Sequence, residues 1–243
     1  MCGRYTITQD LSELEKLVKF ICKITDFKPR YNIAPRSHVP VLVWENGQNV
    51  LKEMRWGLIP CRSKDEKIGD KLTNARAETL TEKPSFKKPF EKQRCLIPCD
   101  GYFEWQRSDQ GKIPFRFTML DDRFFCLAGL WERWIRPHLE GELGLDDTGP
   151  SISQVVETFT IITTEPNLMA AKVHSRMPVI LGPEHYSWWL EPKFEPEFLK
   201  TLLRPFPADL MQCSRVSVVV NDARNDGPAC IAFSSGHDAR MLN

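Results

Sequence analysis

Short strand-like runs separated by turn-rich breaks limit the fold of this chain more than any other feature. Runs rich in β-branched and aromatic residues are typical of strands, and they lie at 39–44, 50–56, 94–98, 101–105, 113–119, 124–131 and 158–163, with a last one near 215–220. Predicted helices are interspersed among them without the regular strand–helix alternation that builds a parallel sheet. The pattern therefore predicts a mixed α+β fold rather than a doubly wound one.

Three segments are expected to be helical. Residues 10–21 have apolar residues at helical spacing, with Asp10 as the cap and Glu13 as its capping-box partner. A second helix is predicted to start near 183–184 and to carry two tryptophans, and a third covers 196–203.

Two segments are expected to lack regular structure. The prolines of 29–36 favour an irregular loop, and residues 135–157 are rich in Gly, Asp, Glu and Ser without periodicity, which indicates a surface excursion. No repeat, linker or change of composition divides the 243 residues. We therefore expect one compact domain over 1–243.

Composition narrows the class of protein. No run reaches the roughly 18 apolar residues of a membrane span, and no basic segment followed by an apolar one marks a signal peptide. We expect a soluble, cytoplasmic monomer. The net charge of +1 argues neither for nor against nucleic acid. Residues 83–94 carry five basic side chains and one acidic one; a solvated loop is favoured there over a phosphate-facing strip.

The cysteines predict neither a metal site nor a cofactor site. Eight are present, but only Cys95 and Cys99 are close together, and no second pair completes a zinc-binding spacing.

The second residue, Cys2, carries a distinctive chemistry if it begins the mature chain. Initiator methionine is normally removed before a small side chain, so we expect Cys2 to be exposed as the first residue. Its α-amine (pKa about 8) and thiol (pKa about 8.5) would then lie on adjacent carbons. An aldehyde condenses with such an amine to an imine, and the thiol closes a thiazolidine. Taken alone, an unremarkable second residue remains the favoured reading.

Asn74 and Arg76 lie two apart on a segment expected to be extended, so they would share one face and could hold a ligand. A surface turn with a salt bridge fits equally well.

Glu104 is expected to point with Tyr102 on its strand, where partial desolvation would raise its pKa and suit it to acid–base work. An exposed carboxylate is the simpler alternative.

His174 has the side chain best matched to proton transfer near neutral pH, and Arg176 follows two residues later. A structural histidine is the commoner case.

The segments 30–35 and 55–60 combine rigid, flat side chains with arginine. That combination suits base stacking and phosphate contact, or an ordinary core edge.

Seven segments in order resemble the SRAP family, the abasic-site processing proteins once described as SOS-response-associated peptidases. They are MCGR, RYNIAP, RWGLIP, TNARAET, DGYFEW, HSRMP and SVVVNDARND, and they run from residue 2 to about 232. The resemblance implies a compact α+β fold with a bifurcated sheet and a barrel-like core. It also implies covalent cross-linking of the N-terminal cysteine to abasic sites in single-stranded DNA, or at a single-strand/duplex junction, as part of the DNA-damage response.

The resemblance assigns catalytic roles to four residues. Cys2 becomes the nucleophile, and Asn74 hydrogen-bonds the opened sugar or holds the N-terminus. Glu104 moves protons during ring opening and imine formation, and His174 is the second acid–base group.

The resemblance also implies a set of DNA-contacting residues, which comprises Arg4, Pro35, Trp56, Arg76, Thr163 and Arg176. For Trp56 the alternative is that it packs in the core. Some relatives have stacking tryptophans just after the segment that ends here at Pro60. This chain has Cys61, Arg62 and Ser63 instead, so the sequence offers the cation of Arg62 in place of a ring.

Two other functions stay open from the sequence. One is a hydrolase that uses Cys2 as an N-terminal nucleophile with Glu104 and His174 as acid–base partners, in its most limited form removing only Met1. The other is a module that covers damaged single-stranded DNA without reacting.

Overall fold

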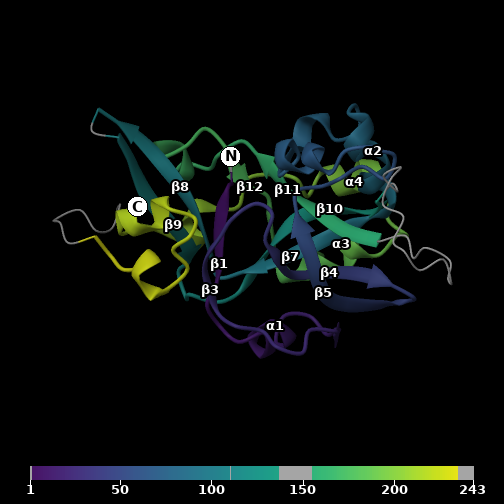
Figure 1. Cartoon of the computed structure of the whole chain (residues 1–243), viewed down its shortest axis with the longest axis horizontal. Helices are drawn as coiled ribbons and strands as arrows, with labels where there is room; N and C mark the ends of the chain where they lie inside the picture. Colours follow the sequence, from purple (N-terminus) through teal and green to yellow (C-terminus); the bar gives the residue numbers. More distant parts are fainter. Residues whose placement is uncertain (1, 110, 137–154, 235–243) are drawn as a thin grey trace, which may run out of the picture.

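Two β-sheets form the frame of the protein (Figure 1). The computed structural model describes residues 2–109, 111–136 and 155–234. In the five-stranded sheet the order is β14-β9-β8-β1-β3. These strands span Met211–Arg215, Gly111–Met119, Gly101–Ser108, Arg4–Ile7 and Arg30–Ile33.

The second sheet closes on itself and makes a barrel. Its order is β12-β11-β10-β7-β4-β5-β2, and β5 also pairs with β11, so β11, β10, β7, β4 and β5 form a continuous ring. In the same order the strands span Met177–Pro178, Val155–Thr164, Phe125–Ile135, Arg94–Cys99, His38–Glu45, Gln48–Trp56 and Ile21–Cys22. Two further strands, β6 at Asn74–Arg76 and β13 at Ile180–Leu181, pair with β11 and β10.

The two sheets branch from a single point in the chain. Strand β7 belongs to the barrel and β8 to the five-stranded sheet, and only Asp100 separates them. The mixed α+β class, the bifurcated sheet and the barrel-like core expected from the sequence are therefore confirmed.

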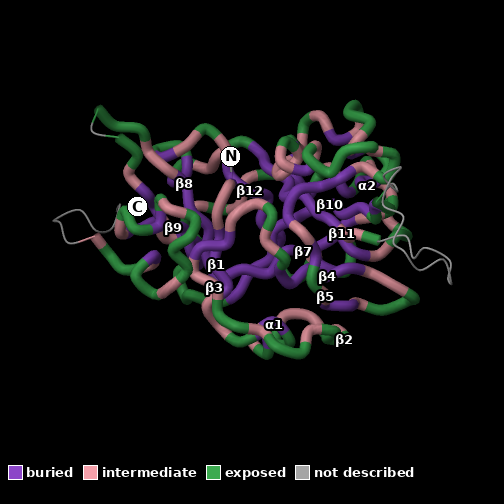
Figure 2. Tube along the Cα trace, viewed as in Figure 1, coloured by how far each residue is buried: buried purple, intermediate pink, exposed green. Residues whose placement is uncertain are grey.

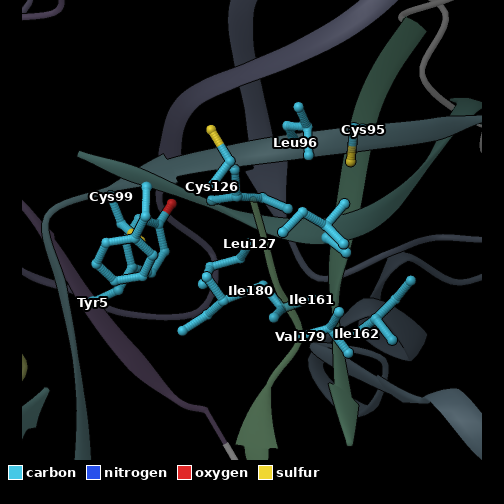
Figure 3. Packing of buried hydrophobic residues seen from close by; sticks show 14 of the residues in the cluster. Tyr5, Cys95, Leu96, Cys99, Cys126, Leu127, Ile161, Ile162, Val179 and Ile180 are labelled. Atoms are coloured by element: carbon cyan, nitrogen blue, oxygen red, sulfur yellow. The ribbon is translucent and has the colours of Figure 1, made fainter. Parts of the chain in front are cut away.

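One core runs through both sheets. Buried residues gather along the strands (Figure 2), and a single cluster of buried side chains includes Tyr5 and Phe117 from one sheet and Leu96 and Ile161 from the other. In Figure 3, Tyr5 lies beside Cys99, the last residue of β7. Strands such as β7 and β10 are buried on both faces over most of their length, which explains why the sequence reads as short apolar runs.

The helices are short and lie outside the sheets. They are α1 at Ser12–Glu15, α2 at Pro84–Lys92, α3 at Tyr186–Leu190 and α4 at Pro196–Lys200. Short 3-10 helices lie at Glu66–Lys71, Ala77–Thr79, Ala170–Lys172, Pro183–His185, Ala208–Leu210, Val218–Asn221 and Pro228–Cys230. The helices predicted near 183–184 and over 196–203 are present in shortened form. No helix within the described ranges is long and apolar enough to cross a membrane.

The helix predicted over 10–21 is wrong beyond its first turn. Only Ser12–Glu15 is α-helical, and Ile21 instead pairs with β5 as part of β2. Glu13 makes an ion pair with Lys16 rather than closing a capping box. Strand pairing at the barrel edge has overridden the local helical pattern, as tertiary contacts often do.

Three other local predictions need correction. The segment 29–36 is not wholly irregular, because Arg30–Ile33 pairs with β1 as an edge strand. The last strand lies at Met211–Arg215 rather than 215–220, where the chain forms a 3-10 turn. Residues 84–92 form helix α2 rather than a loop, and that helix buries Phe86 and Phe90. Most of the excursion predicted over 135–157 lies outside the described residues.

Candidate active site and nucleic-acid interface

Cys2 lies just before strand β1, at the meeting point of the two sheets. Strand β1 pairs antiparallel with β8, and Arg4 is opposite Phe103. Because the two strands run in opposite directions, the residues before Arg4 lie beside those after Phe103, and this brings Cys2 near Glu104. The side chain of Cys2 is fully buried. Burial, followed by the nearby charge of Glu104, raises the pKa of the Cys2 thiol far above its ordinary value. The thiol is therefore held in its neutral form.

Asn74 holds the backbone at Cys2. Strand β6 runs parallel to β11 and pairs Asn74 with Ile161, and the Asn74 side-chain nitrogen donates to the carbonyl of Cys2 at 2.9 Å. The amide oxygen of Asn74 is buried and has no hydrogen-bond partner in the described part of the chain. An acceptor in that position is available to a donor on a bound ligand.

Glu104 is a buried carboxylate on β8, only 4% exposed. Tyr102 packs into the main core while Phe103 and Trp105 join a separate cluster, so the predicted alternation along the strand is confirmed. Burial raises the pKa of Glu104 above its usual range. The exposed carboxylate considered from the sequence is excluded, and Glu104 is suited to accept or donate a proton closer to neutrality.

His174 faces this carboxylate from the loop after the Ala170–Lys172 turn. Its Nδ1 lies 3.8 Å from Oε1 of Glu104. The same Nδ1 lies 3.1 Å from the backbone nitrogen of Arg176 and 3.2 Å from its carbonyl oxygen, so it accepts or donates there according to the tautomer of the imidazole. Cys2, Asn74, Glu104 and His174 thus come together from four distant parts of the sequence.

The arginines around this cluster differ in how firmly they are held. Both terminal nitrogens of Arg176 donate to Glu78, at 2.6 and 2.9 Å, and one also donates to the carbonyl of Thr163 at 2.6 Å. Thr163 is fully buried, so it supports Arg176 and has no exposed surface of its own. Arg76, which pairs with Thr163 across β6 and β11, is exposed.

Arg4 is held by groups far along the chain. It donates to Oδ1 of Asn32 at 2.8 Å and to the carbonyl of Val220 at 2.9 Å. Its guanidinium lies 5.8 Å from the centre of the Trp105 ring. Partial burial lowers the pKa of Arg4. Trp105 was not singled out from the sequence as a site residue, although it directly follows Glu104.

Trp56 does not face DNA. It is fully buried, lies against Tyr5 and Phe159, and donates from its indole nitrogen to the carbonyl of Thr73 at 2.9 Å. The alternative that it packs in the core is correct. Pro35 is half-buried. Arg62 is exposed, and it lies just after Pro60, where some relatives were expected to have stacking tryptophans.

The described residues contain no group of three or more His, Cys, Asp or Glu side chains arranged to hold a metal ion. All eight cysteines are free thiols.

Comparison with known proteins places this arrangement in a family. The family described as SOS response associated peptidase (SRAP) matches residues 1–223. The abasic site processing protein YoqW of Bacillus subtilis is 42% identical over 236 residues, which cover 95% of this chain and 99% of that protein. The abasic site processing protein HMCES of Gallus gallus is 31% identical, over 84% of this chain and 66% of that protein.

The fold has also been seen by crystallography. A protein from Bacteroides thetaiotaomicron superimposes with a TM-score of 0.81 at 26% identity, covering 95% of this chain and 98% of that one. Sequence and fold agree over nearly the whole length, and the chain belongs to the SRAP family.

Proposed function

We propose that the protein processes abasic sites in single-stranded DNA by cross-linking Cys2, after removal of Met1, to the opened sugar. The single observation that carries this proposal is the convergence of Asn74, Glu104 and His174 on Cys2. The relatives named abasic site processing proteins support the same substrate. The adduct would shield the lesion from strand cleavage and error-prone copying during the response to DNA damage.

The chemistry begins at the amine. The opened deoxyribose exposes an aldehyde at C1′, and the α-amine of Cys2 attacks it to give a carbinolamine. Loss of water, with Glu104 delivering a proton to the departing hydroxyl and then taking the proton from nitrogen, gives the imine. The sulfur of Cys2 then bonds to C1′ and the imine nitrogen gains a proton, which closes the thiazolidine. Sulfur attacks second because the imine carbon to which it adds must form first, and the proton of the thiol is the one that passes to nitrogen.

Asn74 and His174 assist at either side of this reaction. The free acceptor on Asn74 suits a hydroxyl of the opened sugar, while its amide nitrogen keeps the Cys2 backbone in place. His174 relays protons to and from Glu104. Arg4, Arg76 and Arg176 lie around the cluster and are proposed to contact phosphates, with Pro35 at the DNA-facing surface.

The first test is cross-linking to a single-stranded oligonucleotide that contains one abasic site, followed on a denaturing gel. The processed wild-type protein is expected to give a band that survives denaturation, and Cys2→Ala none. An undamaged oligonucleotide is the substrate control. Absence of the band, with intact mass confirming that Cys2 is the first residue, would reject the mechanism.

The family's description as a peptidase favours one alternative, a hydrolase with Cys2 as nucleophile. It predicts turnover of an amide substrate, or self-removal of Met1, that is lost in Cys2→Ala and in Glu104→Gln. Complete Met1 removal in Glu104→Gln by the host's aminopeptidase, with no amide turnover by the wild-type protein, would exclude it.

A further inference from the structure

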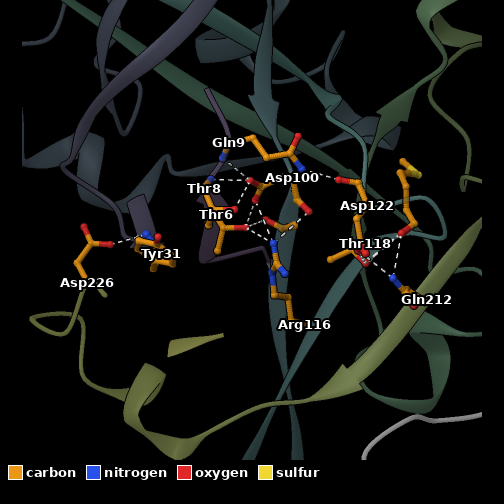
Figure 4. A network of polar contacts seen from close by, with 12 residues as sticks. Thr6, Thr8, Gln9, Tyr31, Asp100, Arg116, Thr118, Asp122, Gln212 and Asp226 are labelled. Carbon is orange, nitrogen blue, oxygen red and sulfur yellow. Dashed lines mark hydrogen bonds and ion pairs between the residues drawn. The ribbon is translucent and has the colours of Figure 1, made fainter. Parts of the chain in front are cut away.

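A buried polar network stands at the point where the two sheets separate. Its centre is Asp100, the single residue between β7 and β8, which is only 1% exposed (Figure 4). The proposed chemistry makes no use of this network. A buried carboxylate is costly unless hydrogen bonds and a cation compensate it, so its presence at this junction calls for an explanation.

The Asp100 carboxylate is compensated almost entirely by the N-terminal strand and the residues just after it. One oxygen accepts from the Thr6 hydroxyl at 2.5 Å. The other accepts from the backbone and hydroxyl of Thr8, at 2.5 and 2.7 Å, and from the backbone of Gln9 at 3.1 Å. The backbone N–H of Asp100 also donates to the carbonyl of Thr6 at 3.0 Å.

Arg116 on β9 completes the network. The position of its guanidinium depends on Gly101, the residue that follows Asp100. Its Nη2 donates to Asp100 Oδ1 and to the Thr6 hydroxyl, both at 3.0 Å. A Cβ on Gly101 would lie 2.6 Å from Nε of Arg116 and 2.9 Å from Nη2. The guanidinium therefore occupies the space of the missing side chain, which explains why Gly follows Asp in this motif.

The strand that this network holds is the one that carries Cys2. Strand β1 pairs with β8 at only three positions, Arg4 with Phe103, Tyr5 with Tyr102 and Thr6 with Gly101. Cys2 precedes these pairs and Glu104 follows them on the partner strand. Slippage by one residue would turn every side chain of β1 to the other face. The other strand that pairs with β1 is β3, and that pairing is itself irregular between Tyr5 and Ile7, so the contacts of Asp100 have a large share in setting the register.

We infer that Asp100, Gly101 and Arg116 form a positioning unit that fixes the register of β1 against β8 and so holds Cys2 at Glu104. This inference rests on the proposed function for its catalytic consequence, but the placement of Cys2 can be tested without DNA. Asp100→Asn replaces an acceptor oxygen with an N–H₂ group facing donors. Gly101→Ala leaves the carboxylate intact and displaces only Arg116.

The DNA-independent test measures alkylation of each cysteine by N-ethylmaleimide, using peptide mapping under conditions where every variant is folded. We expect alkylation of Cys2 to rise at least about tenfold in Asp100→Asn and in Gly101→Ala, as a displaced strand exposes the thiol, while Cys95 and Cys126 stay protected. Glu157→Gln, which disturbs a comparable ion-pair network on the barrel at Lys52 and Arg133, is the matched control and should leave Cys2 protected. Unchanged protection of Cys2, or equal exposure of all three thiols, would overturn the inference.

The second test separates positioning from binding during cross-linking. The rate constant at saturating abasic DNA is expected to fall by about 10- to 100-fold in both variants, because a misplacement of about 1 Å has that effect. The DNA concentration at half-maximal rate should rise by no more than about tenfold, because of the proposed phosphate contacts only Arg4 lies on β1, while Arg76 and Arg176 stay in place. Equal losses in Glu157→Gln would indicate only a general structural role and would overturn the inference. If the wild-type protein forms no adduct, the proposed function fails, while the alkylation test still decides the placement of Cys2.

Discussion

At the scale of single residues, the site contains a group, the carboxyl of Glu104, that lowers the stability of the folded protein but suits the proposed reaction. Glu104 is buried beside a buried thiol, and its raised pKa means that folding favours the protonated carboxyl. At pH values above that raised pKa the folded protein holds a carboxylate whose hydration has been lost. Strained or destabilised groups of this kind are typical of active sites.

We expect Glu104→Gln to stabilise the protein near neutral pH and to slow cross-linking. Between the unfolded pKa near 4.5 and the higher folded pKa, the folded state binds more protons than the unfolded state, so wild-type stability falls as pH rises. The glutamine cannot ionise and escapes this loss. Melting temperatures measured across this range should therefore diverge with rising pH and converge below about pH 4.5.

In the same variant, affinity for abasic DNA should stay within about threefold when measured on a Cys2→Ala background, because the phosphate-facing arginines are unchanged. A pH-independent difference in melting temperature would contradict the burial argument. An equal loss of binding and cross-linking would contradict the catalytic role.

At the scale of secondary-structure elements, one buried arginine joins two short helices. Arg94 is 3% exposed and donates to the carbonyls of Phe90 and Glu91 at the end of α2, at 2.9 and 2.6 Å. It also donates to Trp189 and Glu191 at the end of α3, at 2.6 and 2.7 Å. Burial lowers the pKa of Arg94 to about 10. The cation remains charged at neutral pH and satisfies carbonyls that a helix end leaves unpaired.

Replacing Arg94 with Met should destabilise the protein by about 3 kcal/mol, since several buried carbonyls lose their donor. Arg94→Lys keeps the charge but cannot reach both helices, so an intermediate loss is expected. Chemical denaturation at neutral pH provides the measurement, with Lys87→Met on the exposed face of α2 as the control. A loss below about 1 kcal/mol in Arg94→Met would show that water replaces the guanidinium.

At the scale of the whole molecule, the C-terminal segment folds back to hold the N-terminal site. Asp226 accepts from the backbone of Tyr31 at 2.6 Å and of Asn32 at 2.9 Å, and forms an ion pair with Arg30. Asn32 in turn donates to three carbonyls of the C-terminal segment, including that of Val220. The orientation of Arg4 therefore depends on residues more than two hundred positions away.

We expect Asp226→Ala to loosen this segment. Amide exchange within 217–231 should accelerate, and affinity for single-stranded DNA should fall by about three- to tenfold as Arg4 loses its fixed partners, equivalent to roughly 1 kcal/mol. Asp209→Ala, an exposed carboxylate outside the site, should change neither quantity. Faster exchange without weaker DNA binding would remove Arg4 from the phosphate-contacting set.

The strand predictions succeeded where a strand is buried on both faces, because such a strand appears in the sequence as a continuous apolar run. Runs such as 39–44 and 124–131 are apolar because both faces of a barrel strand lie against packed side chains. The helix over 10–21 failed because Ile21 gains a strand partner that no local pattern reveals. Trp56 could be assigned either to DNA or to the core from its neighbours, and only the surrounding rings decide for the core.

By itself, the sequence determined the α+β class, the residue types available for chemistry and the motifs that mark the family. It did so because strand periodicity, turn residues and reactive side chains are local properties of a chain. The tertiary structure alone decided which strands pair to close the barrel, that Glu104 is buried rather than exposed, and that Asp100 accepts hydrogen bonds from Thr6, Thr8 and Gln9. Those features depend on contacts between residues distant in sequence, and burial, hydrogen bonding and pKa are set by such contacts.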